Sequence, residues 1–228
     1  AVTSQPVPYH ADTTAIFNTL CQQNSNSLLL DSAEIGSKNS LQSLILINAA
    51  VKITCLGNQV TFRALNANGK QVLKEIHPVL SQLGTVSAVN FDNEFSVQFA
   101  PLDNQLDEDS KLQAATIFDG LRVISNHYQH SSTPVFLGGL FAYDLVANFI
   151  PMQGVELKDD GIHCPDYSFY LAENLITIDH QSQQATLKSF CFSQEEQVEV
   201  AKTALSIAQK LKNIDSVLSI KAASDKVS

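Results

Sequence analysis

The stretch Ser27–Leu56 reads SLLLDSAEIGSKNSLQSLILINAAVKITCL and contains the clearest strand pattern in the chain. Its first part, Ser27–Asp31, predicts a strand in which an apolar triplet ends on Asp31 and Ser32. A carboxylate beside a hydroxyl offers acceptors that meet at one point, and such a pair suits the ammonium group of a ligand. Asp and Ser also close turns at strand ends. The local pattern alone favours the turn.

The second part of this stretch predicts a long strand and the start of a hairpin. The apolar segment Leu44–Ala50 continues into Val51–Leu56, and Gly57-Asn58 then supplies a hairpin-type turn. Apolar and polar residues alternate over Asn58–Leu65, which predicts the partner strand. Antiparallel pairing through a short turn is therefore the expected centre of the fold.

Further helices and strands are expected on both sides of this hairpin. The spacing predicts a helix over Asp12–Gln22, a weak helix from Gln71 that Pro78 interrupts, and a strand over Phe95–Phe99. Downstream it predicts one amphipathic helix over Ser110–Tyr128, a buried strand over Val135–Asp144, a helical turn over Leu145–Phe149, and strands over Asp166–Leu171, Leu175–Asp179 and Ala185–Phe192. A last helix opens with a capping-box pattern at Ser193 to Glu196 and is expected to bury Val198, Ala201, Leu205, Ala208 and Leu211. This alternation predicts an α+β fold with antiparallel strands and flanking helices.

The composition is typical of a globular protein with a net acidic charge. The 228 residues are 44% hydrophobic and 16% charged, and the net charge is −9. No Lys or Arg precedes Lys38, which argues against nucleic acid and against an anionic membrane surface as partners. The N-terminus lacks a signal-peptide pattern, and the four cysteines are widely spaced, as in proteins with reduced thiols. We therefore expect a cytoplasmic protein.

Patterns that suggest catalysis or metal binding have simpler explanations. His127 and His130 have a spacing that suits a shared metal, but no Asp, Glu or Cys follows at a supporting distance. His163 and Cys164 are adjacent, so their side chains point to opposite faces of an extended chain. The acidic loop Asp103–Asp109 does not match a calcium-binding loop. The residues by themselves predict no catalytic site, metal or cofactor here.

Four blocks together resemble the N-terminal region of bacterial anthranilate synthase component I, in its gamma-proteobacterial form. They are Leu28–Lys38 (LLLDSAEIGSK), Leu106–Arg122 (LDEDSKLQAATIFDGLR), Phe136–Phe149 (FLGGLFAYDLVANF) and Cys164–His180 (CPDYSFYLAENLITIDH). The resemblance implies that residues 1–214 form the regulatory domain of that family and that residues 215–228 are a linker toward a chorismate-binding domain. It also implies antiparallel sheets that pack roughly orthogonally.

The resemblance implies a lyase that converts chorismate and glutamine-derived ammonia to anthranilate and pyruvate, the first step of L-tryptophan biosynthesis. In the family, chorismate and Mg²⁺ bind in a C-terminal region, and a separate glutamine amidotransferase subunit supplies the ammonia. The catalytic blocks of that region are not found here, so this chain alone is expected to be inactive and to hold no cofactor. Its expected partners are L-tryptophan, the C-terminal chorismate-binding domain and the amidotransferase subunit. Self-association through an exposed sheet edge is left open.

For this region the resemblance implies feedback inhibition by L-tryptophan, in a pocket between the regulatory and catalytic domains. Ser32 matches the serine of the family's tryptophan-binding element, and Asp31 replaces its usual glutamate with a side chain one methylene shorter. Lys38 matches a family lysine, whereas Gln42 stands where close relatives often have lysine. Arg122 matches a position linked to inhibition and is expected to support the pocket wall. Ser32, Asp31 and Lys38 are the expected ligand contacts.

Two other interpretations stay open. The N-terminal region of aminodeoxychorismate synthase is similar and can also hold tryptophan, although Cys164–Glu173 and Phe136–Phe149 favour anthranilate synthase. The chain is alternatively a stand-alone amino-acid-binding or interaction module. A reading frame that continues past Ser228 into a chorismate-binding region would exclude this second alternative.

Overall fold

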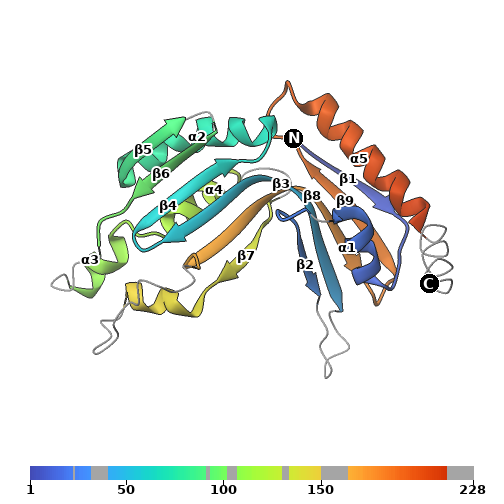
Figure 1. Ribbon diagram of the computed structural model, residues 1–228, viewed down its shortest axis with the longest axis horizontal. Helices are drawn as coiled ribbons and strands as arrows, with labels where there is room; N and C mark the ends of the chain where they lie inside the picture. Colours follow the sequence, from blue (N-terminus) through green and yellow to red (C-terminus); the bar gives the residue numbers. More distant parts are fainter. Residues whose placement is uncertain are drawn as a thin grey trace, which may run out of the picture. The chain divides into compact units, whose positions relative to one another are not determined.

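The structure, a computed structural model, describes residues 1–22, 24–31, 41–90, 93–101, 107–129, 134–149 and 164–214. Its strands are β1 (Val2–Val7), β2 (Leu28–Asp31), β3 (Gln42–Leu56), β4 (Gln59–Ala64), β5 (Thr85–Asn90), β6 (Glu94–Gln98), β7 (Leu137–Phe141), β8 (Tyr167–Asp179) and β9 (Gln184–Phe190). Its helices are α1 (Thr13–Cys21), α2 (Ala67–Leu83), α3 (Glu108–Gln113), α4 (Asp119–His127) and α5 (Gln197–Lys212), with a 3₁₀ turn η1 (Tyr143–Asn148). The prediction of an α+β fold is confirmed (Figure 1).

The strands described here are connected by hydrogen bonds in the order β1-β9-β8-β3-β4-β6-β5, with β2 paired to β3 and β7 paired to β8. The chain divides into two compact units: unit 1 comprises Ala1–Ala49 and Ala172–Ser228, and unit 2 comprises Ala50–Leu171. Both boundaries fall inside the long strands β3 and β8, which therefore contribute residues to both units. The orthogonal packing of sheets stays a prediction.

In unit 1, α1 and α5 pack against strands β3, β8 and β9 around one apolar core. The core contains Ile16, Leu20, Cys21, Ile45, Ile47, Ile176, Ile178, Ala185, Leu187, Ala204, Ile207, Leu211 and Ile214. Its strand residues are two apart, as expected when one face of a sheet is buried. The Asp12 side chain accepts from the backbone N–H of Ala15 at 2.9 Å and so caps α1. The predicted helix at Asp12–Gln22 is confirmed.

In unit 2, α2 packs against β4, β5, β6 and α4. The rings of Phe62 on β4 and Phe95 on β6 stack with their centroids 5.2 Å apart, and both side chains are buried. The predicted hairpin is confirmed, since β3 pairs with β4 across the turn at Gly57-Asn58. Gly57 has φ +57°, the left-handed conformation that such turns require.

The predicted interruption at Pro78 is wrong, because α2 continues through it to Leu83. The helix also begins earlier than predicted, where the Asn66 side chain accepts from the backbone N–H of Gly69 at 2.9 Å. Its buried apolar residues are Val72, Leu73, Ile76 and Leu80. A proline inside a helix costs about 3 kcal/mol, whereas each buried side chain of this kind contributes roughly 1.5–3 kcal/mol. Packing therefore outweighs the proline.

The single helix predicted over Ser110–Tyr128 is also wrong, since α3 ends at Gln113 and α4 begins at Asp119. The Asp119 carboxylate accepts from the backbone N–H of Thr116 at 2.6 Å, and the Tyr167 hydroxyl donates to the carbonyl of Ile117 at 2.7 Å. These bonds use backbone groups that a continuous helix would pair internally.

On α5 the predicted burial is confirmed for Leu211 but wrong for Val198, Ala201 and Leu205, which are exposed, and Ala208 is only half-buried. Val198 and Leu205 are both 65% exposed, and the buried residues are Val200, Ala204, Ile207 and Leu211. The predicted capping box is wrong in position, because α5 begins at Gln197 and its N-cap is Glu196, which makes no side-chain cap bond, instead of Ser193. Apolar residues occur on two adjacent stripes of this helix, so only contact with the sheet distinguishes them.

The remaining differences concern strands. The predicted strand Val135–Asp144 is shorter and not buried, since Leu140 and Phe141 of β7 are largely exposed. The two strands predicted within residues 166–179 are one continuous strand, β8. The strands β1 and β5 were not predicted; β1 ends the strand order, where its Pro6 is tolerated. No helix in the described part of the chain is long and apolar enough to span a bilayer.

Candidate functional site

Asp31 lies at the end of β2 with its side chain exposed. The antiparallel register of β2 and β3 places it opposite Ser43. The Ser43 hydroxyl donates to Asp31 Oδ1, and the Thr13 hydroxyl on α1 donates to Asp31 Oδ2 at 3.3 Å. Both hydroxyl residues are buried. Because a carboxylate accepts about four hydrogen bonds, Asp31 is held on both oxygens and keeps acceptor capacity toward solvent.

A histidine and a tyrosine extend this arrangement. Nε2 of His180, which follows β8, lies 2.8 Å from Ser43 Oγ, and Nδ1 of His180 lies 3.1 Å from the Tyr9 hydroxyl oxygen. The two rings meet edge to face, with centroids 5.8 Å apart and an interplanar angle of 75°. We call Tyr9, Thr13, Asp31, Ser43 and His180 the Asp31 network. All five residues belong to unit 1.

The Asp31 network contains Ser, His and Asp but does not have the order needed for nucleophilic catalysis. In a catalytic triad the histidine lies between the carboxylate and the serine and takes the serine proton. Here Ser43 lies between the other two, and its proton points to Asp31 because a carboxylate can only accept. Ser43 is also 0% exposed. The network is suited to holding a carboxylate in place.

The other predicted site residues are distributed as follows. Ser32 and Lys38 lie outside the described residues, so their roles stay predictions. Gln42 is exposed at the first position of β3. Arg122 lies on α4 in unit 2 and pairs with Asp119, with Nη1 3.2 Å from Oδ1. The supporting roles of Gln42 and Arg122 also stay predictions.

The sequence analysis missed the residues that hold Asp31. Tyr9 and His180 are 171 positions apart, and Ser43 and His180 are 137 apart. No spacing within the chain could connect them, since strand pairing and helix packing bring them together. The sequence did place His180 at the end of a block that resembles the family, Cys164–His180. That block does not indicate which residue the His180 imidazole contacts.

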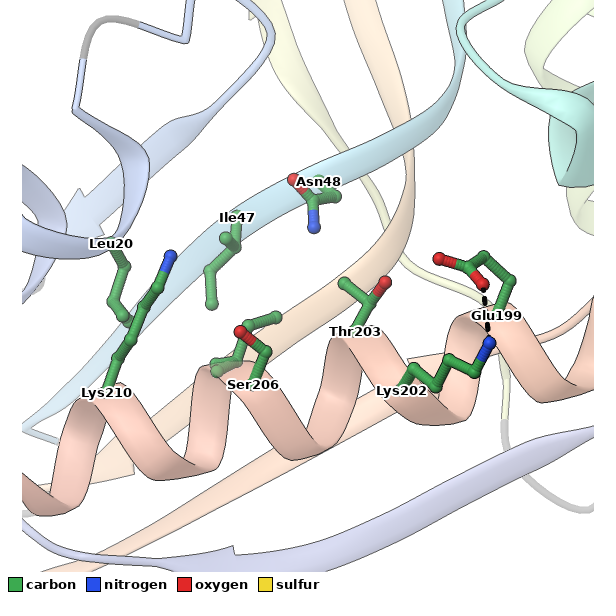
Figure 2. A pocket seen from close by; sticks show the side chains of 9 residues that line it. Leu20, Ile47, Asn48, Glu199, Lys202, Thr203, Ser206 and Lys210 are labelled. Carbon is green, nitrogen blue, oxygen red and sulfur yellow. Dashed lines mark hydrogen bonds and ion pairs between the residues drawn. The ribbon is translucent and has the colours of Figure 1, made fainter.

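Unit 1 also contains an open groove between α5, β3 and α1 (Figure 2). It has a volume of about 370 Å³ and is lined by Leu20, Ile47, Asn48, Glu199, Lys202, Thr203, Ser206, Ile207 and Lys210. Figure 2 shows the Asn48 amide directed toward α5, and Lys202 paired with Glu199 at 3.4 Å. No residue of the Asp31 network lines this groove, so the two features are distinct.

Within the described ranges, no three His, Cys, Asp or Glu side chains gather in a way that could hold a metal ion. His127 has a different partner, since its Nε2 lies 3.1 Å from Glu75 Oε2. The same carboxylate oxygen accepts from the Tyr128 hydroxyl at 2.6 Å. His130 lies outside the described residues.

The chain is similar to proteins named anthranilate synthase component 1 from several bacteria. It is 85% identical over 227 residues to the protein of Haemophilus influenzae, a match that covers 100% of this chain and 44% of that protein. It is 44% identical to the Vibrio cholerae protein and 36% identical to the Escherichia coli protein, with 82% and 86% of this chain and 35% and 37% of those proteins covered. The chain therefore spans less than half the length of these curated relatives.

A family model described as chorismate binding enzyme matches residues 72–226, which is more than half of the chain. The match begins within α2 and includes η1, β7, β8, β9 and α5. Together with the 85% identity to the Haemophilus protein, it confirms the family expected from the four sequence blocks. The chain belongs to the family of chorismate binding enzymes.

Proposed function

We propose that this chain is the N-terminal regulatory domain of an anthranilate synthase component I and supplies one side of its L-tryptophan feedback pocket. Residues 1–214 form that domain, and residues 215–228 lead to a C-terminal chorismate-binding domain. The whole enzyme converts chorismate and glutamine-derived ammonia to anthranilate and pyruvate. The names of the relatives support the enzyme class. The observation that carries the regulatory role is the exposed Asp31 carboxylate, which two buried hydroxyl groups hold and which directly precedes Ser32 in the sequence.

The chemistry of the ligand matches these side chains. The Asp31 carboxylate accepts from the ammonium group of tryptophan, with Ser32 beside it at the same end of the ligand. Lys38 suits the ligand carboxylate. A hydrogen bond to a charged group contributes about 1.5–3 kcal/mol. Residues of the catalytic domain complete the pocket around the indole ring, so the isolated chain binds tryptophan weakly or not at all.

Inhibition follows from differential binding to two arrangements of the regulatory and catalytic domains. Tryptophan inhibits only if it binds the inactive arrangement more tightly than the active one. A tenfold preference requires about 1.4 kcal/mol, which a single charge-assisted contact can supply. Arg122 and Gln42 support the pocket without contacting the ligand.

The remaining partners belong to the whole enzyme. Chorismate and Mg²⁺ bind in the C-terminal domain, and a glutamine amidotransferase subunit, component II, supplies ammonia. The enzyme is cytoplasmic, and its regulatory domain can self-associate through a sheet edge.

The test uses a chimera in which this chain replaces the matching region of the Haemophilus influenzae protein, to which it is 85% identical. Anthranilate formation from chorismate and ammonia is followed by fluorescence while tryptophan is titrated. Asp31→Asn removes the charge and keeps the shape of the side chain. It is expected to raise the half-inhibitory tryptophan concentration about tenfold or more and to leave the uninhibited rate unchanged. Ser32→Ala is expected to act in the same direction.

Glu199→Gln is the matched control, because it removes an exposed carboxylate of the same unit that pairs only weakly with Lys202. Its half-inhibitory concentration should equal that of the unsubstituted chimera. The regulatory proposal is wrong if Asp31→Asn and Glu199→Gln behave alike. Low-micromolar binding of tryptophan to the isolated chain in calorimetry would favour a stand-alone amino-acid-binding module.

A further inference from the structure

We infer that His180 and Tyr9 are positioning residues for the Asp31 carboxylate, and that protonation of His180 weakens the binding of an ammonium ligand there. The inference rests on the proposed tryptophan site and adds its dependence on pH. It is carried by the hydrogen-bond chain from Tyr9 through His180 and Ser43 to Asp31.

Backbone pairing fixes the places of these groups. Asp31 and Ser43 are opposite each other in the β2–β3 register. The backbone N–H of His180 donates to the carbonyl of Leu41 at 2.9 Å, which anchors the end of β8 beside the start of β3. Tyr9 comes from the segment before α1 and meets the imidazole from its other side. The imidazole is therefore held by its backbone and by both ring nitrogens.

The Asp31 carboxylate determines which group donates in each hydrogen bond between Tyr9, His180, Ser43 and Asp31. Asp31 can only accept, so the single Ser43 hydroxyl proton points to Oδ1. Ser43 Oγ must then accept from His180, which places the imidazole proton on Nε2. In the neutral ring Nδ1 is an acceptor, so the Tyr9 hydroxyl donates to it. Tyr9 thus selects the tautomer of His180 that supports Asp31.

Burial makes this support hard to replace. Ser43 is 0% exposed and Thr13 is 4% exposed, so water has little access to the hydroxyl groups that hold the carboxylate. A Ser43 hydroxyl that lost its donor from His180 would keep an unsatisfied buried acceptor. Its rotation would then be less well defined, and so would the orientation of the Asp31 carboxylate.

Protonation of His180 adds a positive charge to the hydrogen-bond network but leaves the hydrogen bonds near Asp31 unchanged. Nε2 still donates to Ser43, while Nδ1 gains a proton and the Tyr9 hydroxyl must turn to accept it. A positive imidazolium then lies one hydroxyl group away from the carboxylate. It competes with the ammonium of a ligand for the same negative charge. Histidine side chains change charge between pH 5 and 8, so the ligand should bind less tightly at acidic pH.

The other charged groups near His180 do not produce this effect. Asp179 precedes it, and hydrogen bonds from the backbone N–H and hydroxyl of Ser182 and from the backbone N–H of Gln181 lower the pKa of that carboxyl. Asp179 therefore stays ionised above pH 5.

The experiment measures half-inhibitory tryptophan concentrations of the chimera between pH 7.5 and 5.5, with each rate referred to the uninhibited rate at the same pH. In the unsubstituted chimera this concentration should rise about three- to tenfold on acidification, from the repulsion of two unit charges at close range. His180→Gln keeps an amide N–H for Ser43 and does not titrate, so it should give normal inhibition at pH 7.5 and a flat profile. His180→Leu, which lacks the donor, should weaken inhibition at every pH.

Tyr9→Phe should weaken inhibition by a few fold at pH 7.5, since the tautomer is no longer selected. Uninhibited rates and thermal unfolding of each variant separate loss of fold from loss of positioning, and the conservative Gln variant remains informative if His180→Leu is unstable. The inference is overturned if His180→Gln shows the same slope with pH as the unsubstituted chimera while Asp31→Asn weakens inhibition. If Asp31→Asn has no effect at any pH, the proposed tryptophan site itself fails.

Discussion

The close approach of α2 to β3 gives the sharpest test of the fold. Gly69 lies in the first turn of α2, and a Cβ atom built there would be 1.9 Å from the carbonyl oxygen and 2.7 Å from the carbonyl carbon of Ala50. Both atoms belong to the backbone of β3, so no side-chain rotation relieves the contact. The same oxygen accepts from the backbone N–H of Leu65 at 2.8 Å. Gly69→Ala must therefore displace either the helix or this hydrogen bond.

The expected cost of Gly69→Ala combines three effects. Alanine gains about 1 kcal/mol of helix propensity over glycine. Overpacking costs about 1–3 kcal/mol, and a buried carbonyl that loses its donor costs about 1–3 kcal/mol more. The free energy of unfolding should therefore fall by about 1–5 kcal/mol. For a chain of this size, that corresponds to a decrease of roughly 2–20 °C in Tm.

Thermal unfolding of the 228-residue chain, followed by circular dichroism, measures this effect. Gly57→Ala is the control, because Gly57 has φ +57° and no atom within 4 Å of a built Cβ. It should cost about 1–2 kcal/mol from backbone conformation alone, and Gly57→Asn should cost less. A Gly69→Ala protein that melts within 1 °C of the unsubstituted chain would show that α2 does not approach Ala50 this closely.

Three further predictions concern helix faces and a buried thiol. Ile207→Ala should cost about 2–4 kcal/mol and Leu205→Ala less than about 0.5 kcal/mol in urea unfolding, and equal losses would contradict the α5 orientation. Pro78→Ala should raise Tm by restoring a helical donor, and a lower Tm would show that the proline fits its site better. Burial raises the pKa of the Cys55 thiol from 9.0 to about 12, so this thiol ionises first in the unfolded chain and should contribute a fall in stability of about 1.4 kcal/mol per pH unit between pH 9 and 12. Cys55→Ala should make the loss of stability with pH shallower by about that amount, whereas Cys164→Ala, at an exposed position, should leave it unchanged.

Local signals predicted the central hairpin and α1 correctly. The turn at Gly57-Asn58 lies between two segments of alternating apolar and polar residues. Asp12 caps α1, which begins at the next residue. Both features depend on residues within a few positions of one another, which is the range over which turn chemistry and periodicity act. The position of Asp31 at a strand end was predictable for the same reason.

Tertiary packing decided the features that local signals predicted wrongly. The periodicity of α5 allowed two apolar stripes, and contact with the sheet buried the one that contains Ile207. Helix α2 continues through Pro78 because one buried face outweighs one missing hydrogen bond. Which face of a helix is buried, and whether the helix continues through a proline, depends on contacts with residues that are distant in the sequence.

The sequence by itself determined the family, the antiparallel α+β class and the place of Asp31, because motifs and short-range patterns carry that information. The tertiary structure alone decided what holds the Asp31 carboxylate. Ser43 reaches it through strand pairing, His180 contacts Ser43 from the end of β8, and Tyr9 contacts the other ring nitrogen of His180. A hydrogen bond depends on distance and direction in space, and residues 171 positions apart acquire both only when the chain has folded.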